Sequence, residues 1–170
     1  MPNIIQGTAA DSKWRFAIVA SRYNESITDK LLEGAVDTLS AGGIADKAID
    51  VVRVPGAWEI PLVASRLANS GRYAGVLCLG AVIKGETTHD EHINRQVSLA
   101  LGQLALETGV PILFGLLTCN SLEQAIHRSG GNVGNKGVEC AQAALEMAAM
   151  MKSLSQEPRV QSRESRAKPI

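Results

Sequence analysis

Four short apolar segments alternate with helical patterns along this chain, and that alternation constrains the fold more than any other feature. The segments are residues 15–21, 49–54, 74–81 and 110–118, and each has the length of a strand and is rich in Val, Ile or Leu. Three of the four lack a regular polar alternation, which predicts strands that are covered on both faces.

Helical spacing of apolar residues separates these segments. One helix is predicted by Ile27, Leu31, Ala35 and Leu39, which recur at steps of four. A second begins near Thr88, ends at Gly109, and carries its apolar face on Ile93, Val97, Ala100, Leu101 and Leu104; a last helix begins at about Gly137, with Val138, Ala141, Leu145 and Ala148 inward. Strands that alternate with helices predict a three-layer α/β/α sandwich with a four-stranded parallel, flavodoxin-like sheet.

The length of 170 residues is that of one domain with a substantial core. We expect a single domain over residues 1–154, in which residues 1–12 form an extended N-terminal arm without periodicity. From Ser155 the chain turns polar, and we expect residues 155–170 to form a disordered tail.

Charge and cysteine content exclude several classes of partner. Seventeen basic residues balance seventeen acidic ones, so no strong field favours nucleic acid or a membrane surface. The three cysteines, Cys78, Cys119 and Cys140, are far apart and form no CxxC motif, which favours the reducing cytoplasm. Two of them lie inside apolar runs, where buried thiols are expected. No apolar run approaches the roughly 20 residues of a membrane span.

Polar segments follow the predicted strands at their carboxyl ends, where parallel sheets bind ligands. SRYNESIT follows the first strand, PGAWEIP the second and GAVIKGETTH the third, while Phe114 and Thr118 lie in the fourth segment. Tyr23 and Trp58 are either stacking surfaces for a flat ring or edge packing. Glu59 stands at a predicted helix start, where its carboxylate complements the helix dipole or accepts hydrogen bonds from a ligand.

The stretch GETTH contains the most informative local chemistry. Gly85 permits close approach of a ligand, and the N–H groups of Glu86 and Thr87 lie at a helix start, where such donors bind phosphate. His89 then lies in the first turn as a proton carrier. The alternative is that Thr88 caps the helix and His89 is a solvated residue. Arg128 is either a second phosphate contact or solvated.

Two other kinds of site fit these residues less well. His89 and His92 share one helix face, but a metal site needs further ligands, and Asp90 and Glu91 point elsewhere. The glycine-rich stretches GAVIKGET and GGNVGNKG do not match a nucleotide-binding P-loop, because Glu86 takes the place of the required lysine in the first and a glycine follows the lysine in the second.

Several motifs in order, SRYN, VPGAWEIP, LGAVIKGETTH, FGLLT and GNKG, give residues 14–152 a resemblance to the 6,7-dimethyl-8-ribityllumazine synthase family of riboflavin biosynthesis. The resemblance implies condensation of 5-amino-6-(D-ribitylamino)uracil with 3,4-dihydroxy-2-butanone 4-phosphate to the lumazine, phosphate and water. It also implies that no cofactor or metal takes part. The fold it implies is a four-stranded parallel sheet between helices, with the site between adjacent subunits of a pentameric ring.

The resemblance further implies a role for each matching residue. His89 is the proton carrier, Phe114 closes the pocket from the neighbouring subunit, and Lys136 lies near it. Tyr23 stacks on the pyrimidine, at a place that the family usually fills with Phe or Trp. The remaining contacts to ribitylaminouracil come from Ala57, Trp58, Glu59, Ala81, Val82 and Ile83, and those to the butanone phosphate from Glu86, Thr87 and Arg128.

The chain departs from the family after the histidine, where Asp90 and His92 replace aromatic residues. The short link SGGNVGNKG favours a 60-subunit icosahedral shell over a free pentamer or decamer, and riboflavin synthase is the partner that such a shell is expected to enclose. Three alternatives remain: a non-catalytic protein that binds flavin or lumazine, a riboflavin synthase of the related type that dismutates two lumazines, and a purely structural shell protein.

Overall fold

The structure is a computed structural model that describes residues 1–156. Its centre is a parallel sheet of β1 (Phe16–Ser21), β2 (Ile49–Val54), β3 (Gly75–Ile83) and β4 (Ile112–Cys119). The strand order is β2-β1-β3-β4, so β1 and β3 are central. All four predicted strands and their parallel arrangement are confirmed.

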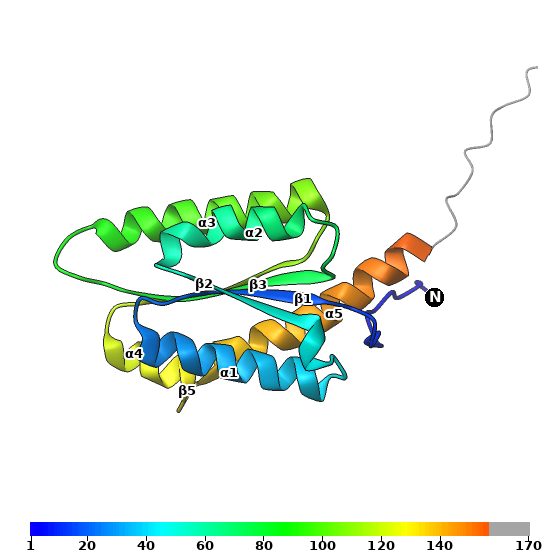
Figure 1. Ribbon diagram of the computed structural model, residues 1–170, viewed down its shortest axis with the longest axis horizontal. Helices are drawn as coiled ribbons and strands as arrows, with labels where there is room; N and C mark the ends of the chain where they lie inside the picture. The colour runs from blue at the N-terminus through cyan, green and yellow to red at the C-terminus, as the bar shows by residue number, and fades with distance from the viewer. Residues whose placement is uncertain (157–170) are drawn as a thin grey trace, which may run out of the picture.

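Helices cover both faces of this sheet (Figure 1). Above it in the view lie α2 (Ile60–Ala68) and α3 (His89–Thr108), and below it lie α1 (Glu25–Ala41), α4 (Leu122–Arg128) and α5 (Lys136–Gln156). The predicted three-layer α/β/α sandwich is therefore confirmed. None of the helices within residues 1–156 is long and apolar enough to cross a membrane.

Alternate residues of the central strands supply two apolar layers. Phe16 and Ile18 pack on the side of α1 and α5, whereas Ala17 and Val19 pack on the side of α2 and α3. Every residue of β1 is buried. Burial on both faces explains why the sequence of this strand shows no polar alternation.

The fourth strand departs from that expectation. Phe114 of β4 is 39% exposed and Thr118 is also exposed, although Leu116 between them is buried. The prediction of full cover on both faces is therefore wrong for β4. The reason is its position at the edge of the sheet, where a single chain offers no further strand beside it.

Helix boundaries follow the predicted signals closely. Thr88 is the N-cap of α3, but its side chain makes no capping hydrogen bond. Gly109 ends that helix in the left-handed conformation at φ 67°, as predicted. The sequence did not predict the short helices η1 (Asp46–Ala48) and η2 (Ala57–Glu59), or the hairpin of β5 (Ser129–Gly131) and β6 (Gly134–Asn135).

The N-terminal arm lies beside helix α5. Residues 1–11 form neither helix nor strand. Gly7 lies so near the backbone of α5 that a Cβ there would collide with the Glu146 carbonyl oxygen, and Lys152 pairs with Asp11 at 2.8 Å. Helix α5 continues to Gln156, so the first two residues of the predicted tail are helical. Residues 157–170 of that tail lie outside the described part.

Candidate active site

A groove of about 610 Å³ opens at the carboxyl ends of β1, β2 and β3, where the sequence predicted a ligand site. Its walls come from the turn after β1, from η2, from the end of β3 and from the start of α3. It brings together nine of the predicted site residues: Tyr23, Ala57, Trp58, Glu59, Ala81, Val82, Ile83, Thr87 and His89.

Two aromatic rings stand at the groove. The backbone N–H of Tyr23 donates to the Pro55 carbonyl at 3.0 Å, which fixes the turn after β1 against the end of β2. The side chains are nevertheless open to solvent, with Tyr23 73% and Trp58 55% exposed. Rings with so much exposed surface are available to stack on a flat ligand.

Glu59 is held in place by the backbone of its own loop. Its Oε2 accepts a hydrogen bond from the Gly56 N–H at 2.9 Å, in the manner of a capping box over η2. The other carboxylate oxygen forms no hydrogen bond with residues 1–156 and can accept one from a ligand hydroxyl or N–H. Ala57, Ala81 and Val82 are buried and form the small apolar floor of the groove.

The loop from Lys84 to Thr88 extends beyond the carboxyl end of β3 (Figure 1). Its last attachment to the sheet is the Lys84 N–H, which donates to the Cys119 carbonyl at 2.8 Å. The N–H groups of Glu86 and Thr87 find no hydrogen-bond acceptor in residues 1–156. Free backbone donors at the start of a helix form a site for an anion.

His89 opens α3 and lines the groove with an exposed side chain. Gly85 and Thr87 line it too, whereas the predicted site residue Glu86 between them does not. His92 is exposed and is not among the lining residues. Over residues 1–156, no group of three or more His, Cys, Asp and Glu side chains is arranged to hold a metal ion.

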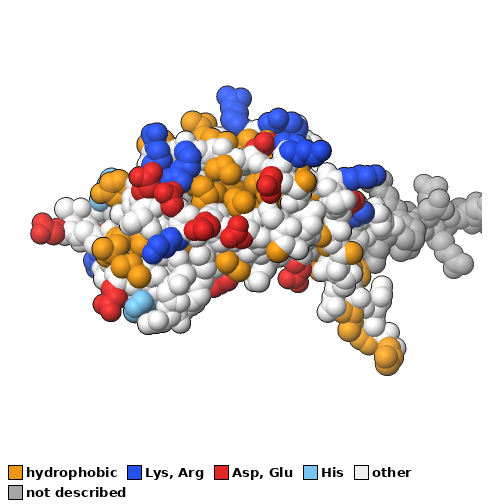
Figure 2. Space-filling view, turned by 60° about the horizontal axis from the view of Figure 1, so that its bottom comes forward, with side chains coloured by type: hydrophobic (Ala, Val, Ile, Leu, Met, Phe, Trp, Pro, Cys, Tyr) orange, Lys and Arg blue, Asp and Glu red, His pale blue; other side chains and the backbone are white. Residues whose placement is uncertain are grey.

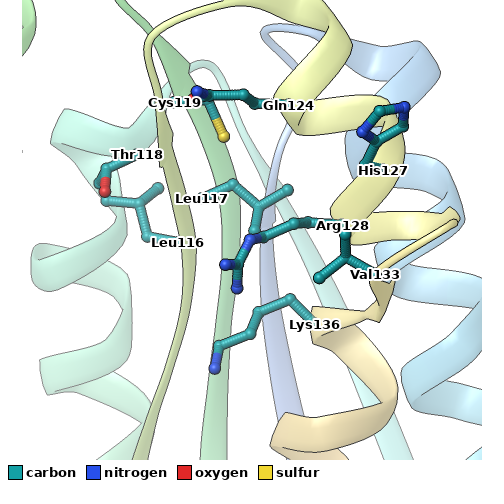
Figure 3. A pocket seen from close by; sticks show the side chains of 9 residues that line it. All are labelled: Leu116, Leu117, Thr118, Cys119, Gln124, His127, Arg128, Val133 and Lys136. Atoms are coloured by element: carbon teal, nitrogen blue, oxygen red, sulfur yellow. The ribbon is translucent and has the colours of Figure 1, made fainter.

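Arg128 and Lys136 line a second pocket, of about 490 Å³, beside β4 (Figure 3). Both side chains extend toward that strand, and Lys136 also pairs with Glu139 at 2.8 Å. None of the residues that line this pocket lines the groove, and Phe114 lines neither of them. Within a single chain, Arg128, Lys136 and Phe114 therefore lie apart from the predicted site residues that line the groove.

The cysteines are unsuited to covalent chemistry. All three are free and buried, including the two that the sequence predicted to be buried. Burial raises the pKa of the Cys119 thiol, although the nearby Arg128 charge partly opposes this, and burial raises the pKa of Cys140 to about 11. Protonated thiols are poor nucleophiles, so Cys119 contributes shape and not reactivity to the second pocket.

Sequence analysis missed several residues of the groove. Pro55 and Gly56 line it beside the predicted Ala57, and Ile93 and Asp90 line it from α3. Pro55 and Gly56 belong to the PGAWEIP segment, so the predicted site residue Ala57 beside them in the sequence could have indicated them. Asp90 was noted only as a departure from the family pattern, and the structure places it at the groove wall.

Comparison with known proteins gives two results. A family model described as 6,7-dimethyl-8-ribityllumazine synthase matches residues 13–152. A protein named 6,7-dimethyl-8-ribityllumazine synthase from Desulfotalea psychrophila (strain LSv54 / DSM 12343) is 53% identical over 154 residues, which cover 91% of this chain and 99% of that relative.

Proposed function

Because this chain belongs to the 6,7-dimethyl-8-ribityllumazine synthase family, we propose that the groove described above is where it carries out the reaction of that family. The protein is a transferase that condenses 5-amino-6-(D-ribitylamino)uracil with 3,4-dihydroxy-2-butanone 4-phosphate. The products are 6,7-dimethyl-8-ribityllumazine, phosphate and water, in the penultimate step of riboflavin biosynthesis. The observation that carries the proposal for the site is the convergence of nine expected residues on one groove.

The wider part of the groove suits ribitylaminouracil. Tyr23 and Trp58 offer exposed rings for the pyrimidine, while the end of β3 from Ala81 to Ile83 offers backbone polar groups to its edge. The carboxylate oxygen of Glu59 that Gly56 leaves free accepts a hydrogen bond from the ribityl chain. These contacts require no cofactor.

The phosphate of the second substrate fits the loop before α3. Free N–H groups of Glu86 and Thr87, together with the positive end of α3, attract the anion. The first turn also carries Asp90 and Glu91, whose negative charges oppose an anion there. A cationic side chain is therefore needed close to the phosphate, and none of the residues lining the groove is an arginine or lysine.

A neighbouring subunit supplies that cation in our proposal. Arg128 forms no ion pair within residues 1–156, and it lies beside the edge strand β4, together with the exposed Phe114. A second chain packed against this edge brings Arg128 and Phe114 to the open side of its neighbour's groove. Lys136 would then lie near the same site.

His89 serves the proton transfers of the reaction. The primary amine of ribitylaminouracil attacks the ketone, and the carbinolamine loses one molecule of water to give an imine. Phosphate then leaves by elimination, and the secondary amine closes the ring on the remaining carbonyl with loss of a second water. An imidazole beside the phosphate loop can donate and accept the protons of these steps. Holding the two substrates side by side supplies much of the remaining rate enhancement.

Our proposal also covers the assembly of the protein into oligomers and its location in the cell. The face formed by α1, α4 and α5 carries hydrophobic side chains gathered among charged ones (Figure 2), including Leu122, Ile126 and Met147. We expect the domain over residues 1–154 to form pentamers, twelve of which build a 60-subunit shell in the cytoplasm. Riboflavin synthase is the expected enclosed partner.

Turnover tests the reaction directly. Purified protein is mixed with both substrates, without metal or nucleotide, and lumazine absorbance and fluorescence are compared with the spontaneous reaction. Acceleration that inorganic phosphate inhibits supports condensation at a phosphate site. Dismutation of added lumazine to riboflavin would favour the related synthase, and tight lumazine binding without turnover would favour the non-catalytic alternative.

A mixed oligomer tests the shared site. His89→Ala and Arg128→Ala chains are co-expressed, so that about one interface in four pairs an intact groove with an intact arginine by random mixing. If Arg128 acts on the neighbouring groove, the mixture exceeds the activity of either variant alone. Activity no higher than the mean of the two variants would place Arg128 outside any shared site.

A further inference from the structure

Asn24 has an unusual backbone conformation at the entrance to α1. It is the one residue other than glycine with a positive φ in residues 1–156, at φ 61° and ψ 47°. Asparagine tolerates this left-handed region better than most residues. The conformation lets the chain turn from β1 into α1, where the Asn24 carbonyl accepts hydrogen bonds from the N–H groups of Ile27 and Thr28.

The side chain of Asn24 does not perform the usual task of its position. An N-cap asparagine normally accepts a hydrogen bond from the second or third N–H of its own helix, but Asn24 makes no such bond. Its Nδ2 instead donates to the Ala81 carbonyl at 2.8 Å, on a strand 57 residues later in the chain. The amide therefore joins the start of α1 to the end of β3.

This bond closes a frame around the groove. The two residues before Asn24 are tied to the end of β2, because Arg22 donates to the Val54 carbonyl at 2.8 Å and Tyr23 to that of Pro55 at 3.0 Å. Through Asn24 the same turn is tied to β3 at Ala81. Tyr23 is 73% exposed, so the position of its ring depends largely on the backbone of this turn.

We propose that Asn24 is a positioning residue for the ribitylaminouracil half of the site. It is not among the residues that line the groove, so it acts through Tyr23 and Ala81, which are. By fixing the spacing between the Tyr23 ring and the backbone of β3, it sets the width of the slot for the pyrimidine. This inference rests on the proposed function and adds to it a residue that controls the affinity for one of the two substrates.

Two substitutions separate the amide from the backbone. Asn24→Gly removes the donor but keeps the left-handed conformation accessible. Asn24→Asp keeps the shape and replaces the donor by a carboxylate oxygen, which repels the Ala81 carbonyl. Asn69→Gly is the matched control, because Asn69 also sits at a helix end and donates from Nδ2 to a backbone carbonyl, that of Ser65 at 2.8 Å, away from the groove.

Steady-state kinetics with each substrate varied in turn gives the readout. We expect the KM for ribitylaminouracil to rise about 3- to 10-fold in Asn24→Gly, the range for loss of one neutral hydrogen bond, and further in Asn24→Asp. The KM for the butanone phosphate and kcat should stay within about 2-fold, and Asn69→Gly should match the wild type. Unchanged KM for ribitylaminouracil in Asn24→Gly, or equal effects on both substrates, would overturn the proposal.

Measuring the binding of the product tests the role of Asn24 independently of whether the protein catalyses the reaction. The affinity for 6,7-dimethyl-8-ribityllumazine is measured by fluorescence titration, which needs no turnover, and should fall in Asn24→Gly and not in Asn69→Gly. A wild-type protein that binds the lumazine without turnover removes the catalytic proposal while this titration still decides the role of Asn24. A wild-type protein that does neither overturns both.

Discussion

His89 and Arg128 lie in different pockets of one chain, and this separation decides what each substitution should do. From the first turn of α3, His89 lines the groove, where we propose that the substrates bind. Arg128 lines the pocket beside β4, and in our proposal it contacts the substrate bound in the groove of a neighbouring subunit. Substitution of His89 should therefore affect proton transfer, and substitution of Arg128 should affect phosphate binding.

His89→Ala should lower kcat by roughly 100-fold while leaving measurable acceleration over the spontaneous reaction, because general acid–base catalysis is one contribution beside substrate positioning. His92→Ala is the control, since His92 is exposed on the same helix and does not line the groove. Lumazine formation is followed by absorbance for both variants. A His89→Ala enzyme that is fully active or wholly inert contradicts the assigned role.

Arg128→Ala should raise the KM for 3,4-dihydroxy-2-butanone 4-phosphate by about 10- to 100-fold, because a charge-assisted contact to phosphate is lost. The KM for ribitylaminouracil should change little. Arg66→Ala is the matched control: Arg66 also lies in the last turn of a helix and is exposed, but it lines neither pocket. A change of similar size in both variants would mean that only net charge matters.

At the scale of elements, the backbones of α1 and α5 approach each other directly at one position, with no side chain between them. Gly137 of α5 is buried, and a Cβ there would collide with the Leu31 carbonyl oxygen of α1. Glycine is required at this position because of close backbone approach, not because of its backbone dihedral angles. The contact holds the helices on the lower face of the sheet together (Figure 1).

Gly137→Ala should lower the free energy of unfolding by about 1–3 kcal/mol, the range for overpacking a tight contact. Gly102→Ala should raise it by about 0.5–1 kcal/mol, because Gly102 lies inside α3 with no heavy atom within 4 Å of its added Cβ. Urea unfolding at equal protein concentration measures both. Equal destabilisation by the two substitutions would refute the backbone contact.

A second element contact joins the beginnings of three strands, at the end of the sheet opposite the groove. Asp50 of β2 accepts hydrogen bonds from the Tyr73 hydroxyl at 2.7 Å and from Arg15 at 2.8 Å. The Tyr73 hydrogen bond, followed by that of Arg15, holds the pKa of Asp50 below its usual value. Burial and the bond to Asp50 raise the pKa of Tyr73.

These shifts set the direction of the pH dependence. A lowered carboxyl pKa stabilises the fold above the unfolded value of about 3.9, and this stability is lost as the pH falls through the folded value. Tyr73→Phe should therefore unfold more easily than wild type near pH 7, with a difference that shrinks below about pH 4. Urea unfolding across pH checks this. Tyr23→Phe, which removes an exposed hydroxyl, should show no such trend.

At the scale of the whole molecule, we propose that the site is completed only when chains assemble. Phe114 of the edge strand β4 is 39% exposed, and later residues of the same strand line the pocket that contains Arg128. An exposed hydrophobic ring on an edge strand is typical of a surface that contacts another protein chain. Activity and assembly should therefore be lost together.

Light scattering after size-exclusion chromatography measures the assembly. Chains of 18.0 kDa give about 90 kDa as a pentamer and about 1,100 kDa as a 60-subunit shell, and we expect the shell. Phe114→Asp should lower the mass and the activity together, because it puts a charge into the contact between subunits. A wild-type mass near 18 kDa with full activity would exclude a site shared between chains.

Much of this molecule follows from local sequence patterns. The four strands, the apolar faces of α1 and α3, and the position of GETTH at the start of a helix depend on residues close together in the chain. Hydrophobic periodicity and glycine signals report such local structure. Nine of the residues that line the groove followed from the family motifs, and its position followed from the rule that parallel sheets bind ligands at their carboxyl ends.

Tertiary structure alone decided how these pieces combine. The strand order β2-β1-β3-β4 places β4 at an edge, and this order exposes Phe114 and separates Arg128 from His89 within one chain. The bond from Asn24 to Ala81 spans 57 residues of sequence, and Gly137 contacts Leu31, which is still farther away along the chain. Such contacts depend on which strands become neighbours, and no local pattern of side chains carries that information.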